Sequence, residues 1–494
     1  MLKESEIKWF IENDNSVKKK LAKKGQAYYE GDHDIKDYKL YYYDANGKLV
    51  ADTTRSNIKI AHPFFTELVD QAVQYILSSD EGFVCSKNPD LQKKMDEYFN
   101  NNDDFIAELE ETLTGCQTKG FEYMYAYKNA EDKIAFMCAD SLGVIEVRAK
   151  DTDDGCEYVI YWYISRIDKE QKTIKKIQVW DEVQTWFYVQ EDDTGDVILD
   201  ESEPINPKPH TLYRREGDDK TYYDNFGFIP FYRLDNNRKQ FSSLKPIKEL
   251  IDDYDLMACG LSNNLQDASE YLVVVSGFQG DNLDELITNT KTKKHIGVDE
   301  NGKVEYKTVD IPYEARKVKL ELDEKNIYRF GMGLNTSGLK DTNATTNIAI
   351  KAAYSLLDLK CNKLETRLKQ LLRKLVNAVI KEINNTDGTD YQSKDVYFRF
   401  SHAVMSNEQE NAQIELTEAQ TKQVEINIIL SLANILDDET VIQYICDQLD
   451  IDYEDIKGKL PKSEEDSVTD AQHNLDGVVV GNEQITEGST AITT

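Results

Sequence analysis

The sequence has few of the residues that build disulfide frameworks, metal sites and membrane spans. Its seven cysteines form no CxxC pair, and its six histidines show no ligand spacing. We therefore expect reduced thiols in a cytosolic setting, and neither a disulfide framework nor a zinc site. No apolar run reaches the roughly 18 residues of a membrane span, and no signal peptide is visible, so the chain is predicted to be neither secreted nor integral to a membrane.

The common catalytic motifs are missing as well. The sequence has no GxxxxGKS/T, HExxH or GxSxG stretch. DTDDG at 151–155 resembles the start of a calcium-binding loop, but its glycine comes one position early, which favours a polar turn. Pairs of acids such as Asp252 and Asp253 could in principle hold Mg²⁺, although in so acidic a chain they are typical of a solvated surface. We therefore predict no enzyme activity, no cofactor and no metal site.

Acidic residues dominate the charge of the chain. It has 91 acidic and 59 basic residues, which gives a formal net charge of -32. Such a protein repels phosphates, which argues against tight wrapping around a nucleic-acid groove but permits weak contact with DNA. At 494 residues the chain exceeds the usual size of a single core, so two to four structural units are expected.

The first half of the chain mixes helical and strand periodicity. Helices are predicted at 4–29, after Pro63, and at 104–118. Between 121 and 199 the apolar period changes to two, as in YVIYWYI at 158–164. This pattern predicts an antiparallel meander with aromatic residues on both faces.

The second half contains the longest helical patterns. An apolar stripe with steps of three and four residues runs from Ile247 to Leu272, which predicts a helix about 40 Å long. A small insert follows, with a short helix and two strand-like runs, KKHIGV and KVEYKTV, which we expect to form a hairpin at Asn301-Gly302. The remaining elements are predicted as helices at 313–330, 348–383 and 408–460, a strand at 395–400, and a disordered tail from Pro461.

The stretch NTSGLKDTNATTN at 335–347 interrupts these helical patterns. It consists of small or polar residues, apart from Leu339, and contains a single lysine, Lys340. A segment with so little to bury is predicted to be a flexible loop, and we expect Gly331, Gly333 and Gly338 to act as hinges that adopt positive φ.

Three motifs, in this order, resemble the portal proteins of tailed double-stranded DNA phages, especially the siphophage head-to-tail connector type. They are NIKIAHPFF leading into LVDQAVQYILS (57–78), GFIPFYRLDNN followed by IKELIDDYD (227–255), and TTNIAIKAAYSLLDLKCNKLE (345–365). The resemblance covers about residues 5–385. It departs from many relatives at Thr346-Asn347, where they carry Ser-Gly, so the resemblance does not fix the hinge of the loop.

The resemblance implies an α+β portal-type fold with a mixed α/β wing, a long-helix stem, a small α/β clip and a helical crown. The implied parts are wing 1–240, stem helix 241–275, clip 276–312, stem helix 313–333, tunnel loop 334–347, long wing helix and strand 348–400, crown 401–460 and a disordered tail 461–494.

The resemblance also implies a function. Such a protein forms a homo-oligomeric ring, expected to have twelve subunits, at one capsid vertex, and double-stranded DNA is packaged and later ejected through its channel. The expected partners are the terminase large subunit, head-completion or adaptor proteins, and the major capsid and scaffolding proteins. The protein would be found in the virion, and in the host cytoplasm during assembly. The alternatives are a non-catalytic capsid or tail scaffold and a metal-dependent packaging nuclease.

The candidate site residues follow from the same resemblance. In the tunnel loop they are Gly338, Leu339, Lys340, Asp341, Thr342 and Asn343, with Lys351 just after it; in the clip they are Lys291, Lys293, Lys294 and His295. Lys340 and Lys351 are expected to come closest to DNA phosphates, while the clip residues would contact DNA or an acidic partner. Each of these lysines could instead be a solvated surface charge. Residues 348–383 contain eight basic and three acidic residues, which would also suit contact with an acidic neighbour in the ring.

Overall fold

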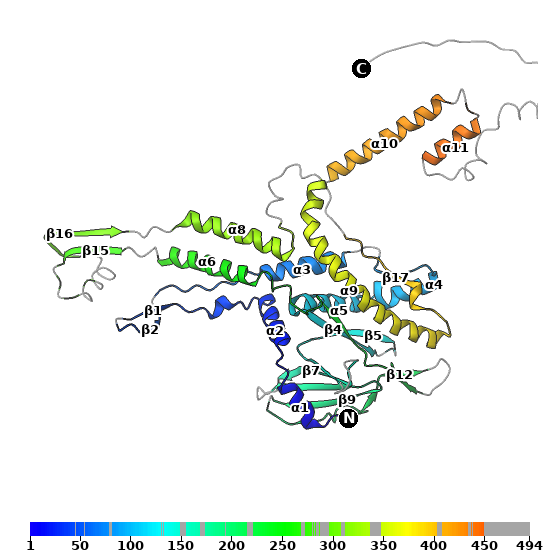
Figure 1. The fold of residues 1–494 in the computed structure, drawn as a ribbon, viewed down its shortest axis with the longest axis horizontal. Coiled ribbons are helices and arrows are strands. Elements are labelled where there is room, and N and C mark those ends of the chain that lie inside the picture. The colour runs from blue at the N-terminus through cyan, green and yellow to red at the C-terminus, as the bar shows by residue number, and fades with distance from the viewer. Residues whose placement is uncertain are drawn as a thin grey trace, which may run out of the picture. The chain divides into compact units, whose positions relative to one another are not determined.

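The computed structural model describes residues 1–448 with several short gaps. The residues that it does not describe within this range are 45, 54, 79–81, 130, 132, 149–154, 168–172, 193, 215–220, 268–271, 279, 281, 283–285, 287–295, 308–311, 336–346, 403–407, 433–435 and 437. The chain divides into two compact units, Met1–Met405 and Ser406–Thr494, within the expected range of two to four. The first unit mixes helices and sheets, which confirms the α and β class (Figure 1).

The single N-terminal helix expected at 4–29 is wrong, because two helices occupy this range. α1 spans Glu4–Glu12 and α2 spans Val17–Tyr29. Ser16 begins the second helix, since its side-chain oxygen accepts a hydrogen bond from the backbone N–H of Lys19 at 3.3 Å. Lys19 itself is buried, and its Nζ donates to the carbonyl of Val144 at 2.7 Å.

The strands expected between 121 and 199 form two sheets and not one meander. The larger sheet has the antiparallel order β10-β9-β8-β7-β6, and β11 pairs with β9. Its strands are β6 (Val144–Val147), β7 (Tyr158–Ile167), β8 (Thr173–Trp180), β9 (Gln184–Glu191), β10 (Val197–Leu199) and β11 (Lys208–Pro209). The smaller sheet has the order β14-β4-β5, with β14 (Phe231–Asp235), β4 (Phe121–Lys128) and β5 (Ile134–Ala139). Local periodicity did not reveal β14, because its partner β4 is distant in the sequence.

Apolar side chains on both faces of β7 hold the sheets in layers. On one face, Ile160 packs with Ile7 of α1, and both residues are fully buried. On the other face, the ring of Tyr161 lies 5.9 Å from that of Tyr125 in the smaller sheet. The prediction of aromatic residues on both faces is therefore confirmed, because Trp162 packs against the cluster that contains Ile160 and Tyr161 packs on the opposite face.

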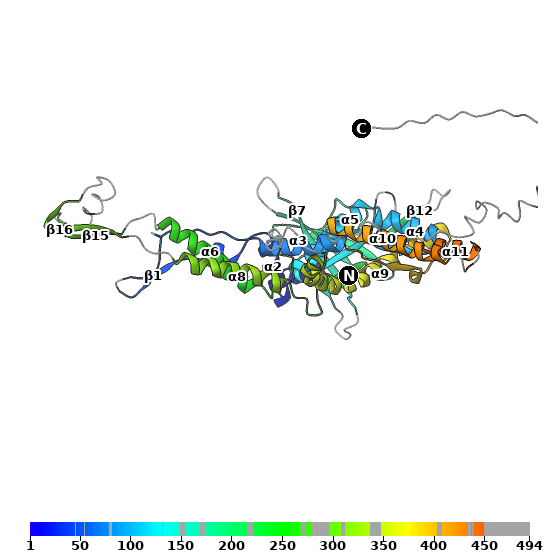
Figure 2. The same cartoon turned by 90° about the horizontal axis from the view of Figure 1, so that it is seen from above.

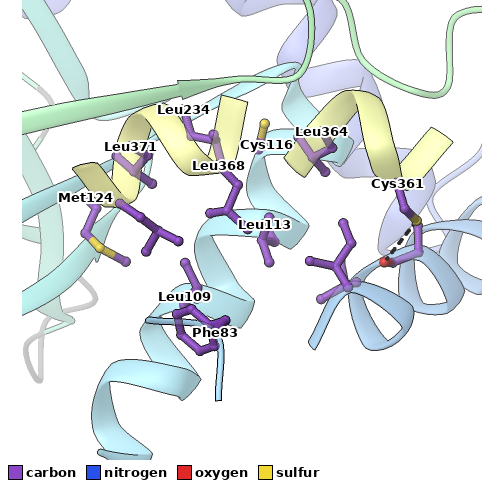
Figure 3. Packing of buried hydrophobic residues seen from close by; sticks show 14 of the residues in the cluster. Phe83, Leu109, Leu113, Cys116, Met124, Leu234, Cys361, Leu364, Leu368 and Leu371 are labelled. Atoms are coloured by element: carbon purple, nitrogen blue, oxygen red, sulfur yellow. Dashed lines mark hydrogen bonds between the residues drawn. The ribbon is translucent and has the colours of Figure 1, made fainter. Parts of the chain in front are cut away.

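Two helices, α5 (Asp103–Lys119) and α9 (Asn347–Asp387), cover the free face of the smaller sheet, and a third, α3 (Phe64–Leu77), packs against both of them. They confirm the helices predicted in these places. Figure 3 shows part of the main core, in which Leu368 of α9 lies next to Leu113 of α5, while Met124 of β4 lies nearer Leu371 of α9. All four of these residues are buried, so this layer is the rigid support for everything attached to α3 and α9.

Helices α6 (Lys248–Asp267) and α8 (Tyr313–Gly331) lie side by side in both views (Figures 1 and 2). The expected extension of the first helix to Leu272 is wrong, because Leu272 begins a strand. With 20 residues, α6 is about 30 Å long and not about 40 Å.

The insert between these helices contains a strand pair with a different register from the expected one. β15 (Leu272–Phe278) pairs with β16 (Val298–Lys307), and Asn301-Gly302 lies inside β16 and not at a hairpin turn. The pairing passes from Ser276 opposite Lys303 to Phe278 opposite Val298, so residues 299–302 form an irregularity in the strand. Gly277, at φ +69°, lies beside Gly302 at this point. The short helix expected near 283–290 lies outside the described residues apart from Leu286.

Small elements complete the first unit. They are η1 (Asp34–Asp37), β1 (Tyr41–Tyr43), β2 (Leu49–Ala51), β3 (Val84–Ser86), α4 (Pro89–Met95), η2 (Asp96–Asn100), β12 (Thr211–Arg214), β13 (Thr221–Asp224), η5 (Ser393–Asp395) and β17 (Val396–Phe398). The strand predicted at 395–400 is thus confirmed in its centre, where β17 pairs with β3.

The second unit contributes two described helices, α10 (Glu408–Ser431) and α11 (Asp438–Gln448), as the helical pattern predicted. Residues 449–494, which include the predicted tail, are not described. All seven cysteines lie among the described residues, and none of them forms a disulfide there. None of the described helices combines the length and the apolar character that crossing a membrane requires.

Candidate functional site

The candidate loop residues Gly338, Leu339, Lys340, Asp341, Thr342 and Asn343 lie outside the described residues, and so do Lys291, Lys293, Lys294 and His295 of the insert. Lys351 is described: it is exposed on α9, one turn before the buried Tyr354. What the structure does place are the two chain ends that hold the loop. Both ends contact α3, through a group of residues that we call the α3 anchor: Glu67, Leu68, Gln71, Ala72 and Tyr75.

The end of α8 is pressed closely against the α3 anchor. A Cβ atom added to Gly333 would lie 2.1 Å from Leu68 Cδ2, and one added to Gly331 would lie 2.6 Å from Leu68 Cδ1. Neither glycine has positive φ; that conformation belongs to Met332, at φ +57°. The expected role of Gly331 and Gly333 as positive-φ hinges is therefore wrong, because they are needed for close approach to Leu68.

Gln71 fixes the chain immediately before the loop. Its Oε1 accepts a hydrogen bond from the Leu334 N–H at 3.0 Å, and its Nε2 donates to the Leu334 carbonyl at 3.1 Å. Nearby, the Tyr328 hydroxyl donates to Glu67 Oε2 at 2.6 Å. The Gln71 side chain thus provides hydrogen bonds for both the N–H and the carbonyl of Leu334, as a neighbouring strand would do.

The chain after the loop returns to the same helix. Tyr75 donates its hydroxyl proton to Asp358, and Lys360 Nζ donates to the Leu68 carbonyl at 3.0 Å. Cys361 Sγ lies 3.7 Å from the Ala72 carbonyl, the contact drawn as a dashed line in Figure 3. Burial disfavours the ammonium form and lowers the pKa of Lys360 to about 8.

A third segment contacts the α3 anchor at its C-terminal end. The His402 ring stacks on Tyr75 with centroids 4.4 Å apart, and its Nδ1 donates to the Tyr75 carbonyl at 3.0 Å. Its Nε2 lies 2.8 Å from Glu365 Oε1 on α9. The chain that follows β17 is therefore held to both α3 and α9.

The base of α6 is held by a second polar cluster, which we call the Asp255 brace. Asp255 is fully buried; His33 Nδ1 donates to its Oδ2 at 2.6 Å, while the ring and backbone N–H of His62 donate to its Oδ1 at 2.7 and 3.0 Å. Burial alone would raise the pKa of Asp255, but the hydrogen bonds from His33 and His62 outweigh it and leave that pKa below its ordinary value. No local sequence pattern indicates this cluster, because its three members lie far apart in the chain.

These contacts form a frame that holds the chain on both sides of residues 336–346. Leu334 is held against α3 before them, and Asp358, Lys360 and Cys361 are held against the same helix after them. A segment of this length can span at most about 40 Å. The described residues contain no group of three or more His, Cys, Asp or Glu side chains that could hold a metal ion.

Comparison with known proteins places this frame in a family. The model of the family "Phage portal protein, SPP1 Gp6-like" matches residues 8–453. The portal protein of Bacillus phage SPP1 is 25% identical over 393 residues, which cover 79% of this chain and 76% of the relative. The portal protein of Clostridium phage phiCD119 is 25% identical over 413 residues, which cover 77% of this chain and 85% of the relative.

Proposed function

The chain belongs to the SPP1 Gp6-like family of phage portal proteins, and on this premise we propose that it is the subunit of a ring at one capsid vertex, through which double-stranded DNA is packaged and later ejected. The family match across residues 8–453 is the observation that carries the proposal. Twelve copies would form the ring, which would bind the terminase large subunit during packaging and head-completion proteins afterwards. The major capsid and scaffolding proteins would surround it during assembly in the host cytoplasm, and the mature virion would retain it.

The parts of the ring are assigned on the same proposal. The two sheets with α3, α5 and α9 form the wing, α6 and α8 form the stem, the β15–β16 pair belongs to the clip, and α10 and α11 belong to the crown. Large apolar side chains on the far half of the stem support a ring, because they are exposed in the single chain: Leu265, Tyr313, Val318 and Leu322. Exposed Leu416, Val424 and Ile428 on α10 support contacts between copies in the crown.

Residues 336–346 would be the tunnel loop that lines the narrowest part of the channel. The α3 anchor supports this role, because a loop that changes shape as DNA passes needs fixed ends. Lys340 and Lys351 would contact phosphates, and the excess of acid in the chain would keep those contacts weak enough for DNA to move. Lys291, Lys293, Lys294 and His295 would contact DNA or an acidic partner at the clip. No catalytic step is assigned to the protein.

Removal of the loop tests the proposal. We expect a variant lacking residues 338–345 to form rings with a central hole in electron micrographs, as the wild type does, but to package or retain DNA poorly. Lys340→Ala should show a milder defect, and Lys340→Arg, which keeps the charge, should behave as the wild type. Normal packaging by the deletion variant would refute the role of the loop. A wild-type protein that stays monomeric, or that packs into particles without a hole, would refute the ring itself.

A further inference from the structure

A large basic cavity of about 1110 Å³ opens between the two sheets and α9. We call it the basic cleft. Six of the residues that line it are basic and three are acidic; the bases are Arg148, Arg233, Arg367, Lys369, Arg373 and Lys374. This excess of positive charge is unexpected in a chain with a net charge of -32, and the established family membership does not account for it.

Some of these bases are already used within the subunit. Arg233 pairs with Glu146 at 2.8 Å and with Asp235 at 2.9 Å. Arg373 donates to the Val396 carbonyl at 2.7 Å and stacks on a neighbouring ring. These contacts fix the walls of the basic cleft.

Two other basic side chains of the cleft are not paired within the described part of the subunit. Among the residues that the structure describes, neither Arg367 nor Lys374 has an acid or a hydrogen-bond acceptor as partner. Both project from α9, which the main core holds in place. The basic cleft therefore presents uncompensated positive charge on a rigid helix, which favours an acidic and equally rigid partner.

The chain has an acidic cavity of its own at a different place. We call this cavity of about 400 Å³ the acidic hollow; it is lined by four acids and a single base: Glu97, Asp104, Glu108, Glu131 and Lys133. Lys133 is paired with Glu97 at 2.5 Å, and Glu108 accepts the Cys138 N–H at 2.7 Å. Asp104 and Glu131 are exposed at its rim, and Glu131 lies 3.9 Å from Lys133 Nζ.

The two cavities lie at opposite edges of the smaller sheet. β14 is one edge strand, and its residues Phe231, Arg233, Leu234 and Asp235 line the basic cleft. β5 is the other edge strand, and its residues Ile134 and Phe136 line the acidic hollow. Because the β4 strand lies between them, one subunit cannot bring these surfaces together. A second copy can, through a head-to-tail contact in which different surfaces of identical chains meet.

We propose that the basic cleft of one subunit binds the acidic hollow of the next copy of this chain. This inference rests on the proposed ring, and it names the surfaces that set the order of the wings in that ring. A head-to-tail contact repeats from copy to copy and closes when the rotation between copies divides a full turn. Opposite charges at such a contact mainly select the partner and fix the register, so they oppose any arrangement that brings two basic clefts together.

Charge reversal and its rescue test this contact. We expect Arg367→Glu with Lys374→Glu to lower the yield of rings about tenfold at low salt, and Asp104→Lys with Glu131→Lys to do the same. The chain that carries all four substitutions should recover most of the wild-type yield, because the charges are then exchanged across the contact. The matched control is Arg238→Glu with Lys239→Glu, which makes the same change of charge on exposed residues outside the basic cleft. Native mass spectrometry measures the yield, and thermal unfolding checks each fold.

A second measurement needs no variant. Wild-type rings assembled from equal amounts of light and heavy-nitrogen protein are treated with a carbodiimide, which joins lysines to carboxylates in direct contact. We expect mixed light and heavy cross-links between the Lys374 and Glu131 peptides.

The outcomes are distinguishable. The contact is refuted, while the ring stands, if the basic-cleft variant and the acidic-hollow variant each assemble as well as the wild type. It is also refuted if the chain with all four substitutions assembles no better than these two variants. Loss of DNA binding by the basic-cleft variant with intact rings would assign the cleft to nucleic acid and also refute the contact. A wild-type chain that never assembles would refute the proposed function itself.

Discussion

The two halves of the α6–α8 pair differ in how far a single chain completes them. Near the sheets, Asp255, Asp323 and Ile327 are buried, and the polar groups among them have partners in the same chain. In the far half, Leu265, Val318 and Leu322 are 57%, 60% and 53% exposed. The near half is therefore largely completed within one chain, apart from Phe330, which is 51% exposed, whereas the far half has several apolar side chains that a single subunit leaves in water.

This difference separates the side chains that stabilise the fold of one chain from those that are left for contacts with another copy. Burial and hydrogen bonding at the base hold α3, α6 and α8 together before any partner arrives. The apolar surface of the far half contributes nothing to the fold of one chain, but it would be buried between neighbouring stems in a ring. Substitutions in the near half should therefore change the free energy of unfolding of one chain, and substitutions in the far half should change the assembly of copies.

The Asp255 brace should give the largest effect on the stability of the chain. We expect Asp255→Ala to lower the free energy of unfolding by about 3–5 kcal/mol, because it leaves His33 and the backbone N–H of His62 without their acceptor in a buried place. Urea titrations of the purified chain would measure this.

Asp253→Ala is the matched control, since Asp253 lies two residues away on α6 and pairs with Lys319 at a partly exposed site. Its loss should lower the free energy of unfolding by less than about 1 kcal/mol. Equal effects of the two substitutions would show that the brace adds nothing beyond an ordinary surface pair.

Lys360 should give a smaller, pH-dependent effect at the α3 anchor. Its pKa is about 8 in the folded chain and near 10.5 for an ordinary lysine, so between these values the folded state binds fewer protons than the unfolded state. The contribution of Lys360 to the free energy of unfolding therefore rises with pH across this window and is smallest below pH 8.

Comparison of Lys360→Met with the wild type would isolate this contribution. The difference in free energy of unfolding between the two proteins should change by about 1–2 kcal/mol between pH 8 and 10.5, after allowing for partial exposure of the amine. Lys363→Met, on an exposed position of the same helix, should leave the pH dependence of the wild type unaltered. A constant difference between Lys360→Met and wild type would show that the pKa of Lys360 is the same in the folded and unfolded chains.

The sequence predicted the long elements well and the contacts between them poorly. α3, α5, α8 and α9 were found because their apolar periodicity continues over several turns. The hairpin predicted at Asn301-Gly302 is wrong, because this dipeptide, although typical of hairpin turns, lies inside β16 opposite an irregular part of β15. In that case the long-range pairing of the strands overrode the local turn preference.

The site divides in the same way. The motif TTNIAIKAAYSLLDLKCNKLE predicts the helix that begins at Asn347, but nothing in it indicates that Gln71 holds Leu334 or that His402 stacks on Tyr75. Those partners are separated by hundreds of residues, so no local pattern records them. Gly331 and Gly333 do matter for their lack of a side chain, but this lack permits close contact with Leu68 and does not serve a positive φ.

The far half of the stem should show the smallest effect on the chain and a clear effect on assembly. Val318→Ser with Leu322→Ser should change the free energy of unfolding of one chain by less than about 0.5 kcal/mol, because both side chains are already exposed. The same substitutions should weaken the ring, since they remove apolar surface from the contact between stems, and analytical ultracentrifugation over a dilution series would measure the loss. Val17→Ser with Leu21→Ser is the matched control, because it replaces the same pair of residue types at the same spacing on exposed positions of α2. If both double variants weaken the ring equally, general surface hydrophobicity drives assembly, and the unfinished half of the stem has no special part in it.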